Sequence, residues 1–123
     1  MPLAILVGLA AALGAVARYV LDQAVARKWE SPYPWGTYAI NVSGSFVLGL
    51  ITGFSLHHGL DPHVVSVLGT GVCGGYTTFS TFNFETIRLT EDGSLAGAFG
   101  NLAAGIASGL LAAAAGLGLA LLI

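Results

Sequence analysis

The chain has 123 residues, of which 55% are hydrophobic and only 8% are charged, and its mean hydropathy is +0.83. Because a soluble domain carries about a quarter charged residues, this composition excludes an ordinary soluble enzyme, and the high hydrophobicity excludes intrinsic disorder. The net charge of −2 gives no basic footprint for nucleic acid. The single cysteine, Cys73, allows neither an intrachain disulfide nor a cysteine-cluster zinc site. The sequence therefore predicts an all-α membrane protein.

Charged residues divide the chain into four long apolar stretches. We expect transmembrane helices over residues 3–20, 37–56, 64–89 and 95–123, each near the roughly 20 residues that span a bilayer. These spans use most of the sequence. Residues 1–123 are therefore expected to form a single four-helix transmembrane domain with short connections.

Two of the connections have a distinctive composition. Residues 28–36 contain two prolines and three aromatic residues, which suits the membrane–water interface. Residues 57–63 contain three histidines and Asp61, which could bind a metal. We favour a plain interfacial loop there, because no pair of histidines has the i,i+4 spacing of a helical metal site.

Glycine is frequent, with 18 in the chain. Gly49 with Gly53, and Gly105 with Gly109, form G-x-x-x-G pairs, which allow membrane helices to approach closely. Helix packing therefore explains many of the glycines.

The third apolar stretch differs from the others. Its double glycine, residues 74–75, is followed by two threonines at 77–78, a pattern that predicts a helix that unwinds and restarts. Irregular backbone at membrane depth is tolerated only where it is buried in protein or faces water. Exposed carbonyls and half-helix ends can bind ions there. The pattern fits an ion site or a kinked helix without an ion, and composition leaves both open.

Phe79 and Phe82 follow the expected break and, being three residues apart, share a helix face. They could be simple packing residues, but their surroundings are rich in hydrogen-bond donors and contain no mid-membrane carboxylate. The donor side chains are Ser80, Thr81, Asn83, Asn41 and Asn101. A phenyl ring also presents a positive edge. A hydrated pathway with this lining favours a small anion over cations.

Three motifs resemble those of the CrcB/Fluc family of fluoride channels, and the resemblance covers essentially the whole chain. They are GAVARY at 14–19, GT at 36–37 with INVSG at 40–44, and GGYTTFSTF at 74–82 with Glu85. The resemblance implies a fluoride-selective passive channel in the plasma membrane (the inner membrane of a bacterial cell) that exports fluoride and lowers its toxicity. It also implies antiparallel, dual-topology homodimers with two fluoride pathways along the interface.

The resemblance assigns roles to individual pathway residues. Phe79 and Phe82 would contact fluoride through their ring edges, and Asn41 would supply a pore amide. The other residues of the implied pathway are Ser80, Thr81, Asn101 and, near the vestibule, Arg18.

The resemblance also implies a structural sodium ion on the two-fold axis, held by backbone carbonyls of Gly74 and Thr77 from both subunits. The fourth helix departs from the family pattern. Where many relatives have a tyrosine followed four residues later by a serine, an ungapped count gives Asn101 and Gly105. Asn101 can still donate to an anion, but Gly105 cannot, and the orientation of Ser108 is left open.

Other function classes explain less of the sequence. A proton-coupled exporter similar to the small multidrug-resistance proteins needs a membrane-embedded carboxylate in its first helix. Residues 3–20 contain no acid, and Glu85 lies near the end of its helix. A non-conducting assembly subunit would explain the glycines but not the polar groups of the third segment. An enzyme is not expected, because no nucleophile–base pair or metal set occurs at a recognisable spacing.

The distribution of basic residues bears on topology. Four spans place both termini and the 57–63 loop on one side, and the 21–36 and 90–94 loops on the other. All four basic residues lie at or near the second side: Arg18, Arg27, Lys28 and Arg88. The positive-inside rule then favours one orientation, whereas an antiparallel homodimer needs both. We prefer the homodimer, because every motif is intact in this one chain. Pairing with an oppositely oriented homologue is the alternative.

Overall fold

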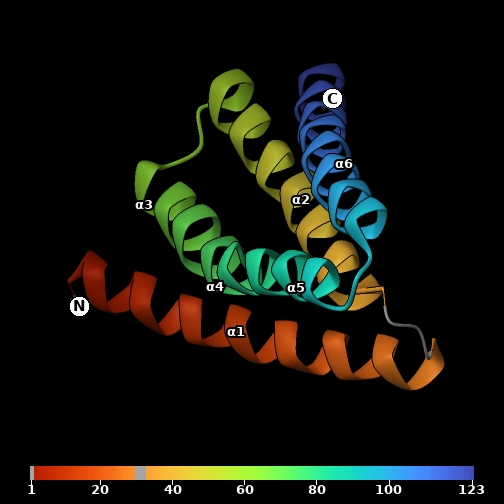
Figure 1. Cartoon of the computed structure of the whole chain (residues 1–123). Coiled ribbons are helices and arrows are strands. Elements are labelled where there is room, and N and C mark those ends of the chain that lie inside the picture. Colours follow the sequence, from red (N-terminus) through yellow and green to blue (C-terminus); the bar gives the residue numbers. More distant parts are fainter. Residues whose placement is uncertain (1, 30–32) are drawn as a thin grey trace.

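The computed structural model describes residues 2–29 and 33–123, and every regular element among them is a helix (Figure 1). In chain order these elements are α1 (Leu3–Lys28), α2 (Trp35–His58), α3 (Pro62–Val65), the π-helix η1 (Ser66–Cys73), α4 (Gly74–Tyr76), α5 (Ser80–Glu91) and α6 (Leu95–Leu122). Within the described residues, α1, α2 and α6 are each long and apolar enough to cross a membrane. The predicted all-helical membrane architecture is confirmed.

The segment predicted as the third span forms a bent series of short helices. Segments α3, η1, α4 and α5 follow one another along a single bent rod, and the chain between α4 and α5 is not helical. This break lies directly after the double glycine, where the sequence predicts it. The π-helical turns of η1 were not expected from the sequence.

Helix α1 is longer than the span predicted for it. It continues beyond residue 20 through Asp22 and Arg27 to Lys28. The apolar pattern marks only the part inside hydrocarbon, and most of the polar residues that follow, namely Gln23, Arg27 and Lys28, are good helix formers. The two basic residues in the last turn also interact favourably with the negative end of the helix dipole.

Specific residues end and restart the helices at the two tight connections. Gly59, with φ of 65°, follows α2, and Gly93, with φ of 88°, follows α5. Both lie in the left-handed region that favours glycine at helix ends. The Asp61 carboxylate accepts the N–H of His63 at 2.7 Å, and the Ser94 hydroxyl accepts the N–H of Gly97 at 3.1 Å. Each bond satisfies an open donor at a helix start.

Helices α2 and α6 lie side by side (Figure 1), and glycines set how closely they approach. A Cβ at Gly49 would overlap the carbonyl of Ala113, and a Cβ at Gly116 would overlap the carbonyl of Phe46. The predicted Gly49/Gly53 pair therefore does contact another helix.

Helix α1 packs along the broken third span in the same way. A Cβ at Gly14 would overlap the Val72 carbonyl, and a Cβ at Gly75 would overlap the Ala11 carbonyl. The break is therefore held against α1 by backbone-to-backbone contact.

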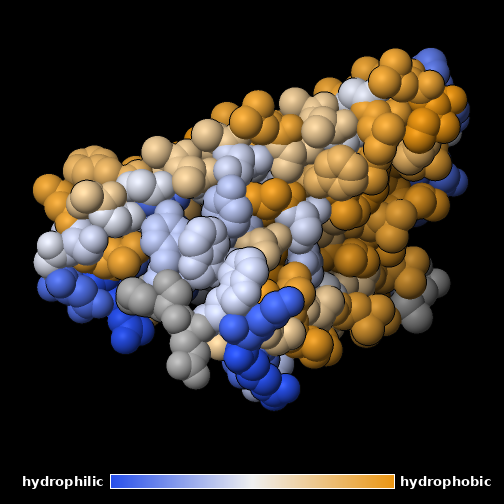
Figure 2. Space-filling view, turned by 90° about the vertical axis from the view of Figure 1, so that its right-hand side faces the viewer, coloured by the Kyte–Doolittle hydropathy of each residue, from blue (hydrophilic) through white to orange (hydrophobic). Residues whose placement is uncertain are grey.

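The single chain exposes much apolar surface. Leu110 on α6 is 68% exposed, and many other large apolar side chains of α1 and α6 are exposed. Figure 2 shows hydrophobic residues over a large continuous part of one face, with strongly hydrophilic residues gathered at its edges. Such a surface requires lipid or another protein to cover it.

Candidate functional site

The non-helical segment between α4 and α5 is built by two threonines. Thr77 has extended backbone angles, φ −79° and ψ 160°, which end α4. Its N–H and its hydroxyl both donate to the Cys73 carbonyl at 2.9 Å. The Thr78 hydroxyl accepts the N–H of Thr81 at 3.1 Å, which satisfies an open donor at the start of α5. Thr78 belongs to the pattern that predicts the break, but its capping role was not predicted, although a threonine just before a helix start is a standard capping signal.

Asn41 on α2 bridges this segment. Its Nδ2 donates to the Thr78 carbonyl at 2.9 Å, and the Thr78 N–H donates to its Oδ1 at 2.9 Å. An asparagine amide has two donor protons, so one N–H of Asn41 stays available after this bridge. In a continuous α-helix the Thr78 N–H would donate to the Gly74 carbonyl, but here it donates to Asn41 instead.

A cavity of about 290 Å³ lies beside the break. It opens to the surface of the chain, and its lining includes Asn41, Gly44, Ser45, Gly74, Thr77 and Phe79. The structure thus brings together Asn41, Gly74, Thr77 and Phe79, which the sequence places on two different helices. Ser80 and Thr81 are exposed next to them at the start of α5.

Phe79 and Phe82 are neighbours, as their spacing predicts. Their ring centroids are 6.4 Å apart, and the ring planes are inclined by 36°. Their environments differ, because Phe79 is 74% exposed and Phe82 only 7% exposed. A Cβ at Gly105 would lie 2.6 Å from the Phe82 ring. Gly105 therefore contacts an aromatic ring, and its G-x-x-x-G partner Gly109 has only an ordinary contact with Ser45.

The fourth-helix residues face α5 and α2 rather than the cavity beside the break. Asn101 is 2% exposed, and its Nδ2 donates to the Thr86 hydroxyl at 2.8 Å. The orientation of Ser108, which the sequence leaves open, is given by its hydrogen bond of 2.6 Å to the Tyr38 hydroxyl.

Arg18 lies at the break itself. Its guanidinium donates to the Thr77 carbonyl at 3.3 Å. A positively charged side chain is therefore bound to one of the two carbonyls that the family resemblance assigns to sodium.

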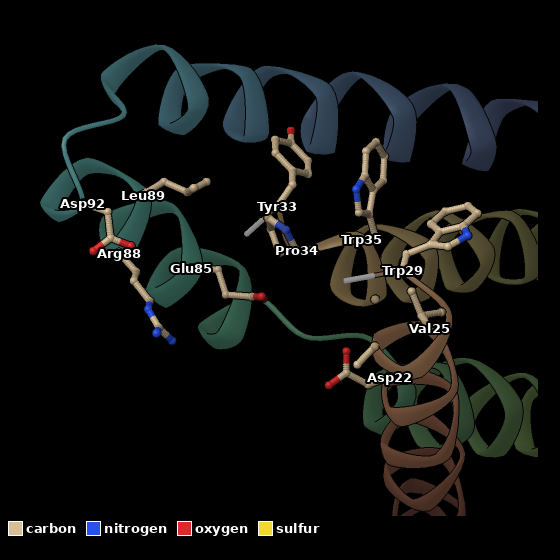
Figure 3. A pocket seen from close by; sticks show the side chains of 12 residues that line it. Asp22, Val25, Trp29, Tyr33, Pro34, Trp35, Glu85, Arg88, Leu89 and Asp92 are labelled. Carbon is tan, nitrogen blue, oxygen red and sulfur yellow. The ribbon is translucent and has the colours of Figure 1, made fainter. Parts of the chain in front are cut away.

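A second cavity, of about 410 Å³, is lined by the last turns of α1 and α5 and by the start of α2 (Figure 3). Figure 3 shows the carboxylates of Asp22 on α1 and Glu85 on α5 directed towards the same space. The Thr37 hydroxyl donates to Glu85 at 2.5 Å. Tyr33 lies in the wall of this cavity. Burial raises the pKa of its hydroxyl, and the nearby Tyr38 raises that pKa further but contributes less. The sequence did not predict that Asp22 lines the same cavity as Glu85 or that Thr37 is the hydrogen-bond partner of Glu85. Glu85 is an acid in an apolar stretch, and such an acid needs a polar partner. This feature of the sequence indicated that a partner such as Thr37 had to exist.

Among the described residues, the loop of residues 57–63, which contains three histidines, does not form a metal site. Asp61 and His63 are paired at 3.3 Å, with both side chains exposed. The described part of the chain contains no group of three or more acidic, histidine or cysteine side chains arranged to hold a metal ion.

Comparison with known proteins identifies the family. The model of the family described as CrcB-like protein, Camphor Resistance (CrcB), matches residues 5–117. The chain belongs to the CrcB family.

Curated relatives of this CrcB chain are named fluoride-specific ion channels. FluC 1 of Streptomyces avermitilis is 50% identical over 106 residues, which cover 86% of each chain. FluC 1 of Leifsonia xyli subsp. xyli is 50% identical over 120 residues, 96% of this chain and 85% of the relative. FluC of Rhizobium meliloti is 40% identical over 116 residues, 94% and 93% of the two chains. These CrcB relatives are channels rather than enzymes, and the chain is a multi-pass protein of the plasma membrane.

Proposed function

We propose that this protein is a passive, fluoride-selective channel that lets fluoride leave the cytoplasm and so lowers its toxicity. The observation that carries the proposal is the 50% identity, over 96% of this chain, to a protein named a fluoride-specific ion channel. The arrangement at the break provides independent chemical support, because it collects donors and a positive charge at membrane depth.

Fluoride is small and strongly hydrated, so a pathway for it must replace the hydrogen bonds of water. The free N–H of Asn41 and the exposed hydroxyls of Ser80 and Thr81 are suitable donors. The exposed Phe79 ring offers its positive edge. Arg18, at 3.3 Å from the Thr77 carbonyl, adds positive charge that attracts an anion.

The pathway is completed by a second copy of the chain in antiparallel orientation. Phe79, Ser80 and Thr81 are exposed in the single chain, as is the hydroxyl pair of Ser43 and Tyr76 at 2.9 Å. Polar groups at membrane depth face protein or a hydrated cavity rather than lipid. A partner copy on this face supplies both, and an oppositely oriented homologue is the alternative partner.

A structural sodium ion fits the break in part. The Gly74 carbonyl has lost its helical partner, because the Thr78 N–H donates to Asn41. The Thr77 carbonyl accepts Arg18, but a carbonyl oxygen has two lone pairs and can accept a further ligand. Carbonyl oxygens from two subunits suit a hard monovalent cation better than a transition metal.

The deciding experiment is fluoride efflux from liposomes that contain only this purified chain. Fluoride release without a proton gradient, and without matching chloride release, is expected. Efflux that needs a proton gradient would favour a coupled exporter. Equal passage of chloride, or no passage of fluoride, would refute the proposal.

A further inference from the structure

A chain of two hydrogen bonds links α6 to the backbone of Phe82. The Nδ2 of Asn101 donates to the Thr86 hydroxyl oxygen at 2.8 Å. The Thr86 hydroxyl in turn donates to the Phe82 carbonyl at 2.9 Å. Bonds in such a chain polarise and strengthen one another in a low-dielectric interior. These two bonds therefore connect the Asn101 side chain to the turn of α5 that carries Phe82.

The ring of Phe82 is held by the same face of α6. Gly105 lies one turn after Asn101, and residues four apart share a helix face. A Cβ at Gly105 would lie 2.6 Å from Cε1 and 2.9 Å from Cζ of the Phe82 ring. Ring and backbone of Phe82 are thus both fixed against α6, which explains why only 7% of this residue is exposed.

Neighbouring residues lack this arrangement. Phe79 is 74% exposed, whereas Phe82 is buried. Thr90, one turn after Thr86, makes the same kind of bond to its own helix, at 3.3 Å to the Thr86 carbonyl. Thr90 is exposed, and its side chain receives no hydrogen bond from an α6 amide within residues 2–29 and 33–123. Asn101 therefore bonds to Thr86, the threonine whose hydroxyl donates to the Phe82 carbonyl.

We propose that Asn101 is a positioning residue: through the Thr86 hydroxyl it fixes Phe82 in the fluoride pathway, and it does not itself bind the ion. This inference rests on the proposed fluoride pathway. A buried amide at membrane depth is retained only when it is paired, and the Asn101 amide, 2% exposed, is paired with Thr86.

The test is fluoride efflux from liposomes that each hold at most one channel. This measurement distinguishes a change in the position of Phe82 from a loss of folded protein. The fraction of fluoride released reports how many channels are active, and the rate reports turnover by each channel. Thr86→Val keeps the shape of threonine but removes both hydrogen bonds. The rate per channel is expected to fall about tenfold, the size of effect expected from losing the one bond of the two that holds the Phe82 carbonyl. Thr86→Ser keeps the hydroxyl and is expected to retain the parent rate. Thr90→Val is the matched control and is also expected to retain it.

A double-variant comparison tests the role of Asn101 directly. Asn101→Ala should slow efflux in the parent but have no further effect in the Thr86→Val background, because the path to Phe82 is already broken. An equal slowing in both backgrounds would overturn the inference and indicate that Asn101 contacts fluoride itself. A Thr86→Val channel with the parent rate would also overturn it, while fluoride efflux by the parent would still support the proposed function.

Discussion

Asn41 and Thr78 form a two-bond bridge between α2 and the break in the third span, with both bonds at 2.9 Å. Thr78 is only 9% exposed, so its peptide groups have little access to water. The bridge replaces the helical bonds that the break removes. It explains how non-helical backbone is stable at membrane depth.

Asn41→Ala is therefore expected to destabilise the protein by about 1–3 kcal/mol, the usual cost of leaving buried polar groups unpaired. Thermal unfolding in detergent would measure this loss. Asn83→Ala is a suitable control, because no hydrogen bond of the Asn83 side chain occurs among the described residues, and its effect should stay within about 0.5 kcal/mol. Equal stability of the two variants would contradict a bracing role for Asn41.

Substituting isoleucine for Phe79 or Phe82 should suppress fluoride conduction, because isoleucine has no polarised ring edge. The two variants should differ in stability. Phe79 is largely exposed in the single chain, whereas Phe82 packs against Gly105. Phe82→Ile is expected to lower the melting temperature and Phe79→Ile to leave it nearly unchanged. Liposome efflux and thermal unfolding measure the two effects. If both variants conduct like the parent, the rings serve packing alone.

The close approach of α2 and α6 depends on Gly116, where a Cβ would overlap the Phe46 carbonyl. Gly116→Ala is expected to cost about 1–3 kcal/mol, typical of overpacking. Gly118, two residues later on the same helix, has no neighbour within 4 Å of such a Cβ. Gly118→Ala should raise stability by up to about 1 kcal/mol through helix propensity. Unfolding that shifts equally in both variants would contradict the packing argument.

The sequence predicts the helical class and the break because both follow from local composition. Apolar length identifies a span, and the double glycine before Thr77 locates the point where helical bonds fail. The end of α1 is not predictable in this way. Hydrophobicity does not distinguish hydrocarbon from the polar turns that extend α1 to Lys28.

Residue types at the site were also predictable, but their partners were not. An asparagine in an apolar helix indicates a buried polar partner, yet nothing local shows that Asn41 bonds to Thr78 or that Asn101 bonds to Thr86. These contacts depend on helix packing, which glycines such as Gly14 and Gly49 set through close approach. The site therefore needed the tertiary structure.

Removal of sodium tests the proposed ion at the break. Exchange of Na⁺ for a large organic cation should weaken the proposed dimer and slow efflux, because the Gly74 carbonyl, whose helical partner Thr78 N–H is bound to Asn41, would lose the proposed cation. Chemical cross-linking and liposome efflux would measure both effects. Added Na⁺ should restore them, whereas Mg²⁺ should not, since Mg²⁺ requires near-ideal octahedral coordination. A dimer that is indifferent to Na⁺ would contradict the site.

Topology decides between a homodimer and a pair of different chains. Arg18 bonds to the Thr77 carbonyl inside the bundle, so it contributes little to the charge of a loop. The remaining orientation bias comes from Arg27 and Lys28 at the end of α1 and from Arg88 in the last turn of α5. We expect a bias from these three residues to be weak enough for insertion in both directions. The chain is therefore expected to insert in both orientations in about equal numbers.

The measurement is labelling of intact cells with a membrane-impermeant thiol reagent at His58→Cys, an exposed position at the end of α2. Cys73 is buried, and Cys73→Ala removes it from the background. Under equal insertion, about half of the copies should be labelled from outside, and permeabilised cells should be labelled fully. Labelling of nearly all or nearly none of the copies would mean one fixed orientation. An antiparallel homodimer could not then form, and the partner would have to be an oppositely oriented homologue.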